Sequence, residues 1–247
     1  MTTIAEKDRQ AVRDALARDL VADVELLLFL RQWAEHSTPS AWGRDERPTS
    51  DETRELLEDL AALSPRLHVT SIDVDADPVS ATQYNVRALP TVIIRRLPGT
   101  GQVGAVPAAS PAIMAGAPTV RFLGLPAGYE FSTLVAAVVD TSRGTTSLTQ
   151  PTRETVRSWT DPVHLQVFVT PNCPYCPRAA RVAHQFAMEN PLVLAEVIEA
   201  NEFQELSTRY AVRTVPKTII NDRVEFVGSL PEANVVEAVK EAVRRAG

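Results

Sequence analysis

The only two cysteines of the chain, Cys173 and Cys176, are separated by two residues in the string TPNCPYC at residues 170–176. An apolar, strand-like run, LQVFV, precedes this string, and a helix-like run follows it from Pro177 to Asn190. A thiol at a helix N-terminus lies beside N–H groups that have no intrahelical partner, and the helix dipole favours negative charge there. Both effects stabilise a thiolate. The spacing and placement of the two cysteines therefore predict a dithiol/disulfide redox centre.

The two cysteines are expected to have different roles. We expect Cys173 to lie exposed at or near the helix N-cap and to act as the attacking thiolate, with a pKa below the free value of about 8.5. Cys176, one turn later, is expected to face inward and to resolve the mixed disulfide. A purely structural bridge is the alternative, but it would close a very small loop and would stabilise the chain little. A redox role is therefore favoured.

Composition and charge narrow the class of protein. A chain with two cysteines in 247 residues is not a disulfide scaffold. The formal net charge of −6, with acidic and basic residues interspersed, argues against a nucleic-acid surface. No apolar stretch approaches the roughly 20 residues of a membrane span, and the charged, helix-like N-terminal segment has no signal-peptide core. We expect a cytoplasmic protein with no nucleic-acid or membrane partner.

An internal repeat is visible in short matched strings. YNVRALPTVII at residues 84–94 and YAVRTVPKTII at residues 210–220 share six of eleven positions at an offset of 126. VRFLG at residues 120–124 and VEFVG at residues 224–228 share three of five positions at an offset of 104. The first half therefore carries 126 − 104 = 22 extra residues between these strings. Matched strings in matched order indicate duplication of one α/β unit.

The predicted fold is α/β, with two tandem units, each a mixed sheet of four or more strands flanked by helices. We expect a first unit at residues 1–141, with a Gly/Pro/Ala-rich insert at 97–118, a linker at 142–161 and a redox unit at 162–247. In the first unit, strands are predicted at 25–31, 68–74, 91–96 and 119–123, and helices at 50–63, 78–84 and 130–141. In the second, strands are predicted at 164–170, 192–198, 217–221 and 223–227, and helices at 173–190, 202–210 and 232–246.

Together, the Cys-x-x-Cys at a strand–helix junction and the later Val215-Pro216 step resemble the thioredoxin superfamily. The Cys-Pro-Tyr-Cys spelling is the glutaredoxin form. The strings VFVTPNCPYCP, AHQFAMEN, VRFLGLPAGYEF and RVEFVGSLPE resemble the two-unit, glutaredoxin-like protein disulfide oxidoreductases of thermophilic archaea and bacteria. LGLPAGYEF is also similar to the two-unit domain that begins the flavoprotein subunit of alkyl hydroperoxide reductase. One departure is large: WAEHS, at residues 33–37, stands where the first unit would carry its cysteines.

This resemblance implies a thioredoxin-like fold and a thiol–disulfide oxidoreductase that exchanges its dithiol with protein disulfides. It implies that Pro216 is a cis-proline next to the cysteines, and that Val215 pairs with an extended substrate strand. Pro174 and Tyr175 are expected to contact the substrate as well. A thioredoxin-reductase-like flavoprotein or a peroxidase is the expected redox partner. The alternative function is a dedicated electron-shuttle or docking module for such a system, with the cysteine-free first unit as scaffold, docking surface or both.

Several polar residues are weaker candidates. Glu199 ends a predicted strand and is either a proton acceptor for Cys176 or, by ordinary burial preference, a solvated strand-end carboxylate. Arg178 and Arg181 either add positive potential near the thiols or are solvated helix charges. Asn172 and the string GSLPE at residues 228–232 depart from the glutathione-binding pattern of glutaredoxins, which favours a protein substrate. The four histidines have no metal-ligand spacing with the cysteines, so no metal and no cofactor are expected.

Overall fold

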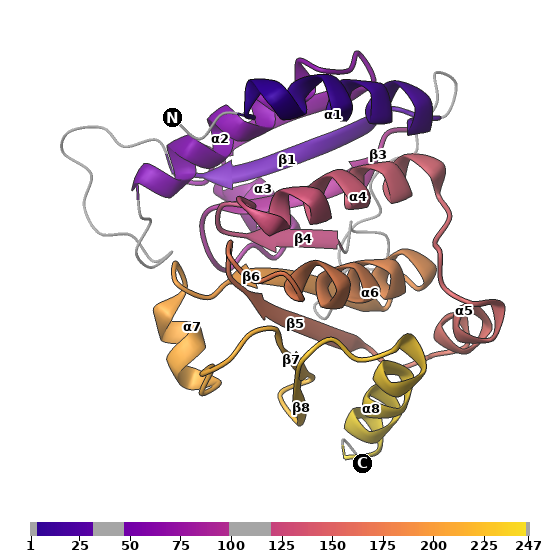
Figure 1. Cartoon of the computed structure of the whole chain (residues 1–247). Helices are drawn as coiled ribbons and strands as arrows, with labels where there is room; N and C mark the ends of the chain where they lie inside the picture. Colours follow the sequence, from indigo (N-terminus) through magenta and orange to yellow (C-terminus); the bar gives the residue numbers. More distant parts are fainter. Residues whose placement is uncertain (1–3, 32–46, 99–119, 246–247) are drawn as a thin grey trace.

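The computed structural model describes residues 4–31, 47–98 and 120–245, which form one mixed eight-stranded sheet with helices on both faces (Figure 1). The strand order is β2-β1-β3-β4-β6-β5-β7-β8. The strands are β1 (Val24–Leu30), β2 (Leu67–Asp73), β3 (Thr91–Arg96), β4 (Val120–Leu123), β5 (Val163–Val169), β6 (Val193–Glu199), β7 (Lys217–Ile220) and β8 (Val224–Val227). The helices are α1 (Glu6–Asp19), α2 (Arg47–Ala61), α3 (Pro78–Gln83), α4 (Tyr129–Arg143), α5 (Gln150–Arg157), α6 (Cys176–Glu189), α7 (Gln204–Arg209) and α8 (Glu232–Arg244).

The two halves of the sheet repeat one topology. In each half the second strand lies parallel beside the first, the third lies antiparallel on the other side of the first, and the fourth pairs with the third. The hairpin register repeats too: Thr91 pairs with Leu123 in the first half, and Lys217 pairs with Val227 in the second. These pairs are related by the offsets of 126 and 104 found in the sequence. The matched strings therefore occupy equivalent positions in the sheet.

The halves join through unlike edges, because β4 of the first pairs in parallel with β6 of the second. Arg121 and Glu196 are direct partners in this register, and an Arg121 Nη lies 3.8 Å from a Glu196 carboxylate oxygen. His164 of β5 lies 2.8 Å from the other oxygen of that carboxylate. A buried polar row thus crosses the junction on one face of the sheet. The sequence predicted two sheets but did not indicate that they are continuous.

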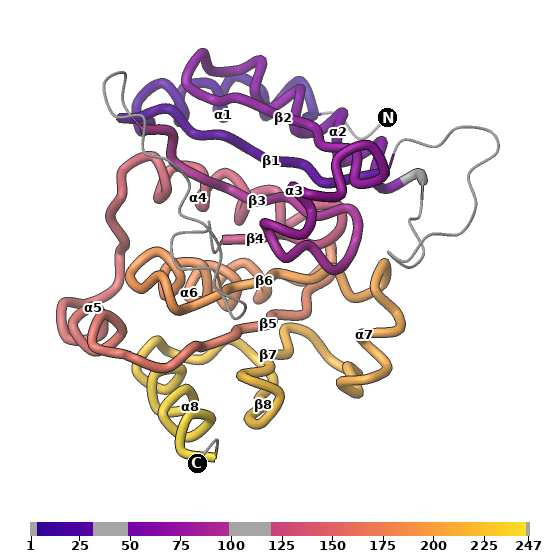
Figure 2. Tube along the Cα trace, turned by 180° about the vertical axis from the view of Figure 1, so that it is seen from behind, coloured from indigo at the N-terminus to yellow at the C-terminus, as the bar shows by residue number. Residues whose placement is uncertain are grey.

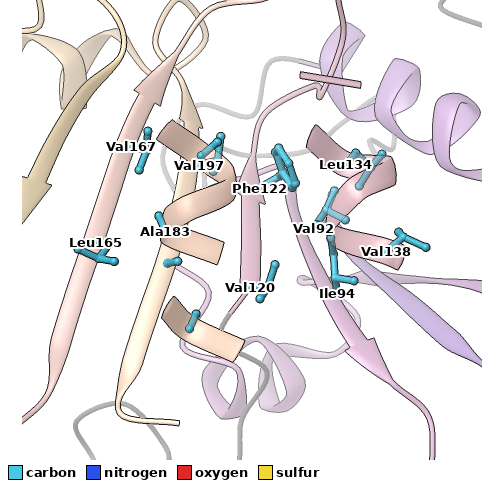
Figure 3. Packing of buried hydrophobic residues seen from close by; sticks show 14 of the residues in the cluster. Val92, Ile94, Val120, Phe122, Leu134, Val138, Leu165, Val167, Ala183 and Val197 are labelled. Atoms are coloured by element: carbon cyan, nitrogen blue, oxygen red, sulfur yellow. The ribbon is translucent and has the colours of Figure 1, made fainter. Parts of the chain in front are cut away.

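The main core lies between the sheet and the helices α1, α2, α4, α6 and α8 and spans both halves. Figure 3 shows its centre, where Phe122 of β4 and Val197 of β6 lie beneath Leu134 of α4 and Ala183 of α6. On the opposite face, seen in Figure 2, α3 and α7 each cover a separate small cluster. Helices α4 and α6 pack directly on each other, so the two halves are joined by helix packing as well as by strand pairing.

Most predicted elements agree with the observed ones to within a few residues, and the exceptions are informative. The predicted helix at 173–190 begins only at Cys176, because residues 170–175 form turns. The predicted linker contains α5, and the N-terminal helix-like segment forms α1. Most of the predicted insert, and the WAEHS string, lie outside the described residues. The boundaries of the two units stay a prediction. None of the helices in the described ranges is long and apolar enough to cross a membrane.

Candidate active site

Cys173 and Cys176 form a disulfide in the turn between β5 and α6. The Cys173 N–H donates to the Thr170 carbonyl at 3.1 Å, and the Cys176 N–H donates to the Cys173 carbonyl at 3.4 Å. Pro177 stands at the start of α6, where a missing N–H costs nothing. The turn places Cys176 at the first helical position, with Tyr175 as the N-cap. Cys173 therefore lies near the N-cap, as expected, but ahead of it in the turn.

Cys173 is less exposed than expected, although it is still more exposed than Cys176. Cys173 was expected to be exposed, but in the disulfide only 7% of its surface is accessible, and Cys176 is fully buried. Tyr175 between them is 72% exposed, and Pro174 is exposed too. The bridge covers most of Cys173 because its sulfur is bonded to a buried partner. Of the two cysteines, only Cys173 therefore keeps any accessible surface.

Val215 and Pro216 lie beside this turn. Phe168 of β5 pairs with Lys217 of β7 in antiparallel register. The chain that follows β5 and the chain that precedes β7 therefore lie at the same end of these two strands. The Val215–Pro216 bond is cis, as expected, and so is the equivalent Leu89–Pro90 bond. Within the part of the chain that the structure describes, the backbone N–H and C=O of Val215 make no hydrogen bond. These groups are available to pair with an added strand.

Glu130 is a site residue that the sequence analysis did not identify. It lies in the first turn of α4, next to Tyr129, whose N–H donates to the carbonyl of Pro171 at 2.9 Å, two residues before Cys173. Glu130 is 2% exposed, and neither carboxylate oxygen has a hydrogen-bond partner among the described residues. Burial raises the pKa of Glu130 to about 7, against a smaller opposing effect of Thr133. A carboxyl group with this pKa exchanges protons readily at neutral pH.

One signal in the sequence could have identified Glu130. It lies four and seven residues before Leu134 and Ala137, so it falls on the apolar stripe of α4. A charged residue on such a stripe indicates either that the buried face of the helix has been assigned wrongly or that the charged group is buried and functional.

The solvated reading of Glu199 is wrong, because its carboxylate is buried. One oxygen accepts a hydrogen bond from the Glu202 N–H at 2.6 Å, and the other accepts one from the Asn201 side chain at 2.8 Å. Burial raises the pKa of Glu199 above its ordinary value, although these hydrogen bonds oppose the shift. Glu199 therefore shapes the loop after β6, and its oxygens are directed to that loop's own N–H groups.

The two arginines of α6 differ. Arg181 donates two hydrogen bonds, at 3.1 and 3.2 Å, to the buried carboxylate of Asp140 in α4, so it links the two halves of the chain. Arg178 is exposed. Within the described ranges, neither arginine makes a hydrogen bond or ion pair with a cysteine. The idea that both simply carry solvated charges is wrong for Arg181.

Among the described residues, no three histidine, cysteine or carboxylate side chains gather in a way that could hold a metal ion. His184 is buried between β4 and α6, and burial lowers its pKa to about 4. His164 is bound to Glu196, and His68 lies 3.7 Å from Asp23. These histidines thus have separate structural surroundings.

Comparison with known proteins places this site in a family. Residues 163–241 match the family model described as a thioredoxin domain. Thioredoxin of Methanocaldococcus jannaschii is 38% identical over 79 residues, which are 32% of this chain and 93% of that protein. A second relative, an alkyl hydroperoxide reductase subunit of Staphylococcus aureus, is 25% identical over 179 residues. These residues are 72% of this chain but only 29% of that larger protein.

A solved structure resembles the whole chain. The protein disulfide oxidoreductase of Aeropyrum pernix superposes with a TM-score of 0.79 and 28% identity, covering 98% of this chain and 94% of that one. The match includes both halves, whereas the family model covers only the half with the cysteines. From the matched domain, the Cys-x-x-Cys disulfide and this superposition, the chain belongs to the thioredoxin family and is a thioredoxin-like thiol–disulfide oxidoreductase.

Proposed function

We propose that Cys173 and Cys176 exchange their dithiol/disulfide with disulfides of other proteins. In the reducing direction, the Cys173 thiolate attacks one sulfur of the substrate disulfide and forms a mixed disulfide. The other substrate sulfur leaves as a thiolate and takes up a proton. Cys176 then loses its proton, attacks the Cys173 sulfur and releases the second substrate thiol. Two electrons pass from the protein's dithiol to the substrate, and the Cys173–Cys176 bridge remains.

The substrate is proposed to bind as an extended strand along Val215. The unpaired N–H and C=O of Val215 would supply main-chain hydrogen bonds, and the antiparallel register between Phe168 and Lys217 supports their position near the cysteine turn. Pro216 keeps its own carbonyl bonded to the Gly228 N–H at 2.8 Å, so only the Val215 groups are offered. Pro174 and Tyr175, both exposed, flank the sulfur that is attacked.

The observation that carries this proposal is the disulfide between a buried Cys176 and a less buried Cys173 at the β5–α6 junction of a thioredoxin domain. We expect the protein to accelerate reduction of insulin by dithiothreitol, measured as turbidity. Cys173→Ser removes the attacking sulfur and should abolish the acceleration. If wild type and Cys173→Ser are indistinguishable, the proposal fails.

A second candidate function is electron transfer to one dedicated partner, such as a peroxidase or a flavoprotein reductase. The observation that favours it is the relationship to the staphylococcal alkyl hydroperoxide reductase, which extends over 72% of this chain and thus beyond the thioredoxin domain. Here the cysteine-free half would serve mainly to hold that partner.

Trapping distinguishes the two candidates. Cys176→Ser cannot resolve the mixed disulfide, so partners should accumulate bound to Cys173 and be released by dithiothreitol. One dominant partner in the trapped pool indicates a dedicated shuttle, whereas many partners indicate a general oxidoreductase. Cys173→Ser is the matched control and should trap nothing through this turn.

The compartment and the reductant are part of the proposal. We place the protein in the cytoplasm, where a single cysteine pair in a chain of this kind cycles between oxidised and reduced forms. A thioredoxin-reductase-like flavoprotein would return electrons to the disulfide. The exchange itself needs no bound cofactor, since both electrons reside in the sulfurs.

A further inference from the structure

A segment of the cysteine-free half reaches the cysteine turn. After β4 the chain at residues 124–129 crosses the end of β6, the strand between β4 and β5 in the sheet. It is held at both ends by the second half: the Leu125 N–H donates to a Glu202 carboxylate oxygen at 2.8 Å, and the Tyr129 N–H donates to the Pro171 carbonyl at 2.9 Å. The first turn of α4 thus lies against the loop that carries Cys173.

The position of Tyr129 is fixed by its neighbours. At Gly128 the φ angle is +60°, and a Cβ atom would lie 2.2 Å from the Pro171 carbonyl oxygen. Only glycine permits this approach. On the other side, Glu130 points into the core. The Tyr129 side chain therefore faces outward, with 52% of its surface exposed.

Two exposed tyrosines, Tyr129 and Tyr175, stand at the beginnings of the neighbouring helices α4 and α6. Within the described ranges, five large apolar or aromatic side chains are prominently exposed, and two of them are Tyr129 and Tyr175. Tyrosine is a residue of interfaces, because its ring gives apolar area at low entropic cost and its hydroxyl stays wet. Neither ring is in contact with another aromatic side chain of the described chain. Tyr175 follows Cys173 by two residues, and the Tyr129 backbone is hydrogen-bonded to Pro171, two residues before Cys173.

We propose that Tyr129 and Tyr175 form a docking surface, the tyrosine pair, for the polypeptide that flanks the substrate disulfide. The occupant is an extended segment with apolar side chains, aligned by the free backbone groups of Val215 and continuous with the redox site. The inference rests on the proposed function and deepens it. The cysteine-free half thereby takes part in choosing protein disulfides over small ones, through one residue on a glycine-fixed turn.

The test compares two substrates of the reduced protein. Rate constants for insulin and for 2-hydroxyethyl disulfide are measured by quenched flow with thiol alkylation, and their ratio is the readout. Tyr129→Ser should lower this ratio about fivefold or more, because a buried aromatic anchor commonly contributes more than 1 kcal/mol. Tyr129→Leu, which keeps apolar area, should retain most of the ratio.

The matched control is Val21→Ser. Val21 is 60% exposed and precedes β1, a strand that runs parallel to β5, so it lies at the opposite end of the strands from Cys173, which follows β5. Its ratio should equal that of wild type. The inference is overturned if Tyr129→Ser keeps the wild-type ratio, or if both rate constants fall together with a shifted pH profile of Cys173 alkylation. Failure of the proposed function would be seen separately: the rate constants of wild type would then not exceed those of Cys173→Ser on either substrate.

Discussion

At the scale of residues, the buried carboxylates of Glu199 and Glu130 have very different surroundings. Glu199 has its oxygens bonded to N–H groups of its own loop, whereas Glu130 is buried with no hydrogen-bond partner among the described residues. An unpaired buried carboxylate is costly when charged, so it holds its proton to higher pH. Burial raises the pKa of Glu130 to about 7, so its charge changes at neutral pH.

The raised pKa of Glu130 makes stability depend on pH. Its pKa is about 7 in the folded chain against an ordinary 4.5, so the folded state binds the proton more tightly. The resulting stabilisation is fully present below pH 4.5 and is lost as pH rises to 7, and it amounts to about 3 kcal/mol. Glu130→Gln has no carboxyl group to titrate and does not lose this stabilisation. Between pH 4.5 and 7.5 the difference in the free energy of unfolding, variant minus wild type, should therefore rise by about 3 kcal/mol.

Urea unfolding of both proteins across this pH range measures the difference. Glu205→Gln is the control, because Glu205 is exposed in α7 and should follow the wild-type curve. Parallel curves for wild type and Glu130→Gln would show that Glu130 titrates as an ordinary solvated acid.

The cysteines, their order of exposure and the cis bond before Pro216 were accessible from the sequence, because each depends on a short local string. The burial of Glu130 was not. It depends on α4 packing against α6, a helix that begins more than 40 residues later. The exposure of Cys173 was overestimated because the sequence shows the dithiol spacing but not how the bridge draws one sulfur against the other.

At the scale of elements, the turn before α4 requires glycine at position 128. Gly128 has φ +60° and no room for a Cβ beside the Pro171 carbonyl. Gly128→Ala should lower the free energy of unfolding by more than the roughly 1–3 kcal/mol of the backbone strain alone, because the clash adds to it. Gly228→Ala is the matched control: its φ is +95°, but nothing lies within 4 Å of the added Cβ.

Chemical denaturation of the two glycine variants separates strain from clash. Gly128→Ala should be the less stable, and its insulin reduction should also be slower, since the turn next to Cys173 must move. Equal losses in the two variants would mean that the approach to Pro171 is not tight in solution.

Hairpins and helices were predictable as elements because their signals are local. Asn221 and Asp222 both have positive φ, which makes the tight turn between β7 and β8 that the sequence indicated. The start of α6 was placed too early, because the apolar pattern cannot distinguish the turn at Cys173 from the first turn of a helix. The pairing of β4 with β6 left no local signal, since the two strands lie more than 65 residues apart in the chain and the charged pair Arg121 and Glu196 is recognised only once they are aligned.

At the scale of the whole molecule, the cysteine-free half packs directly against the half that carries the cysteines. It supplies the segment that binds the Pro171 carbonyl, the buried Glu130 and the Asp140 that holds Arg181. The main core runs through both halves without interruption. The half without cysteines therefore contacts and supports the half that carries them.

The union of β4 with β6 also has a direction. The fourth strand of one copy meets the second strand of the next, which leaves a second-strand edge at β2 and a fourth-strand edge at β8. Because its two edge strands differ in kind, the sheet has a direction, as a head-to-tail filament has. Pairing of unlike edges can be repeated without forming a closed assembly. The free edges at β8 and β2 are of the two kinds that meet at the β4–β6 junction, so the same pairing could in principle be repeated and does not by itself limit the sheet to two halves.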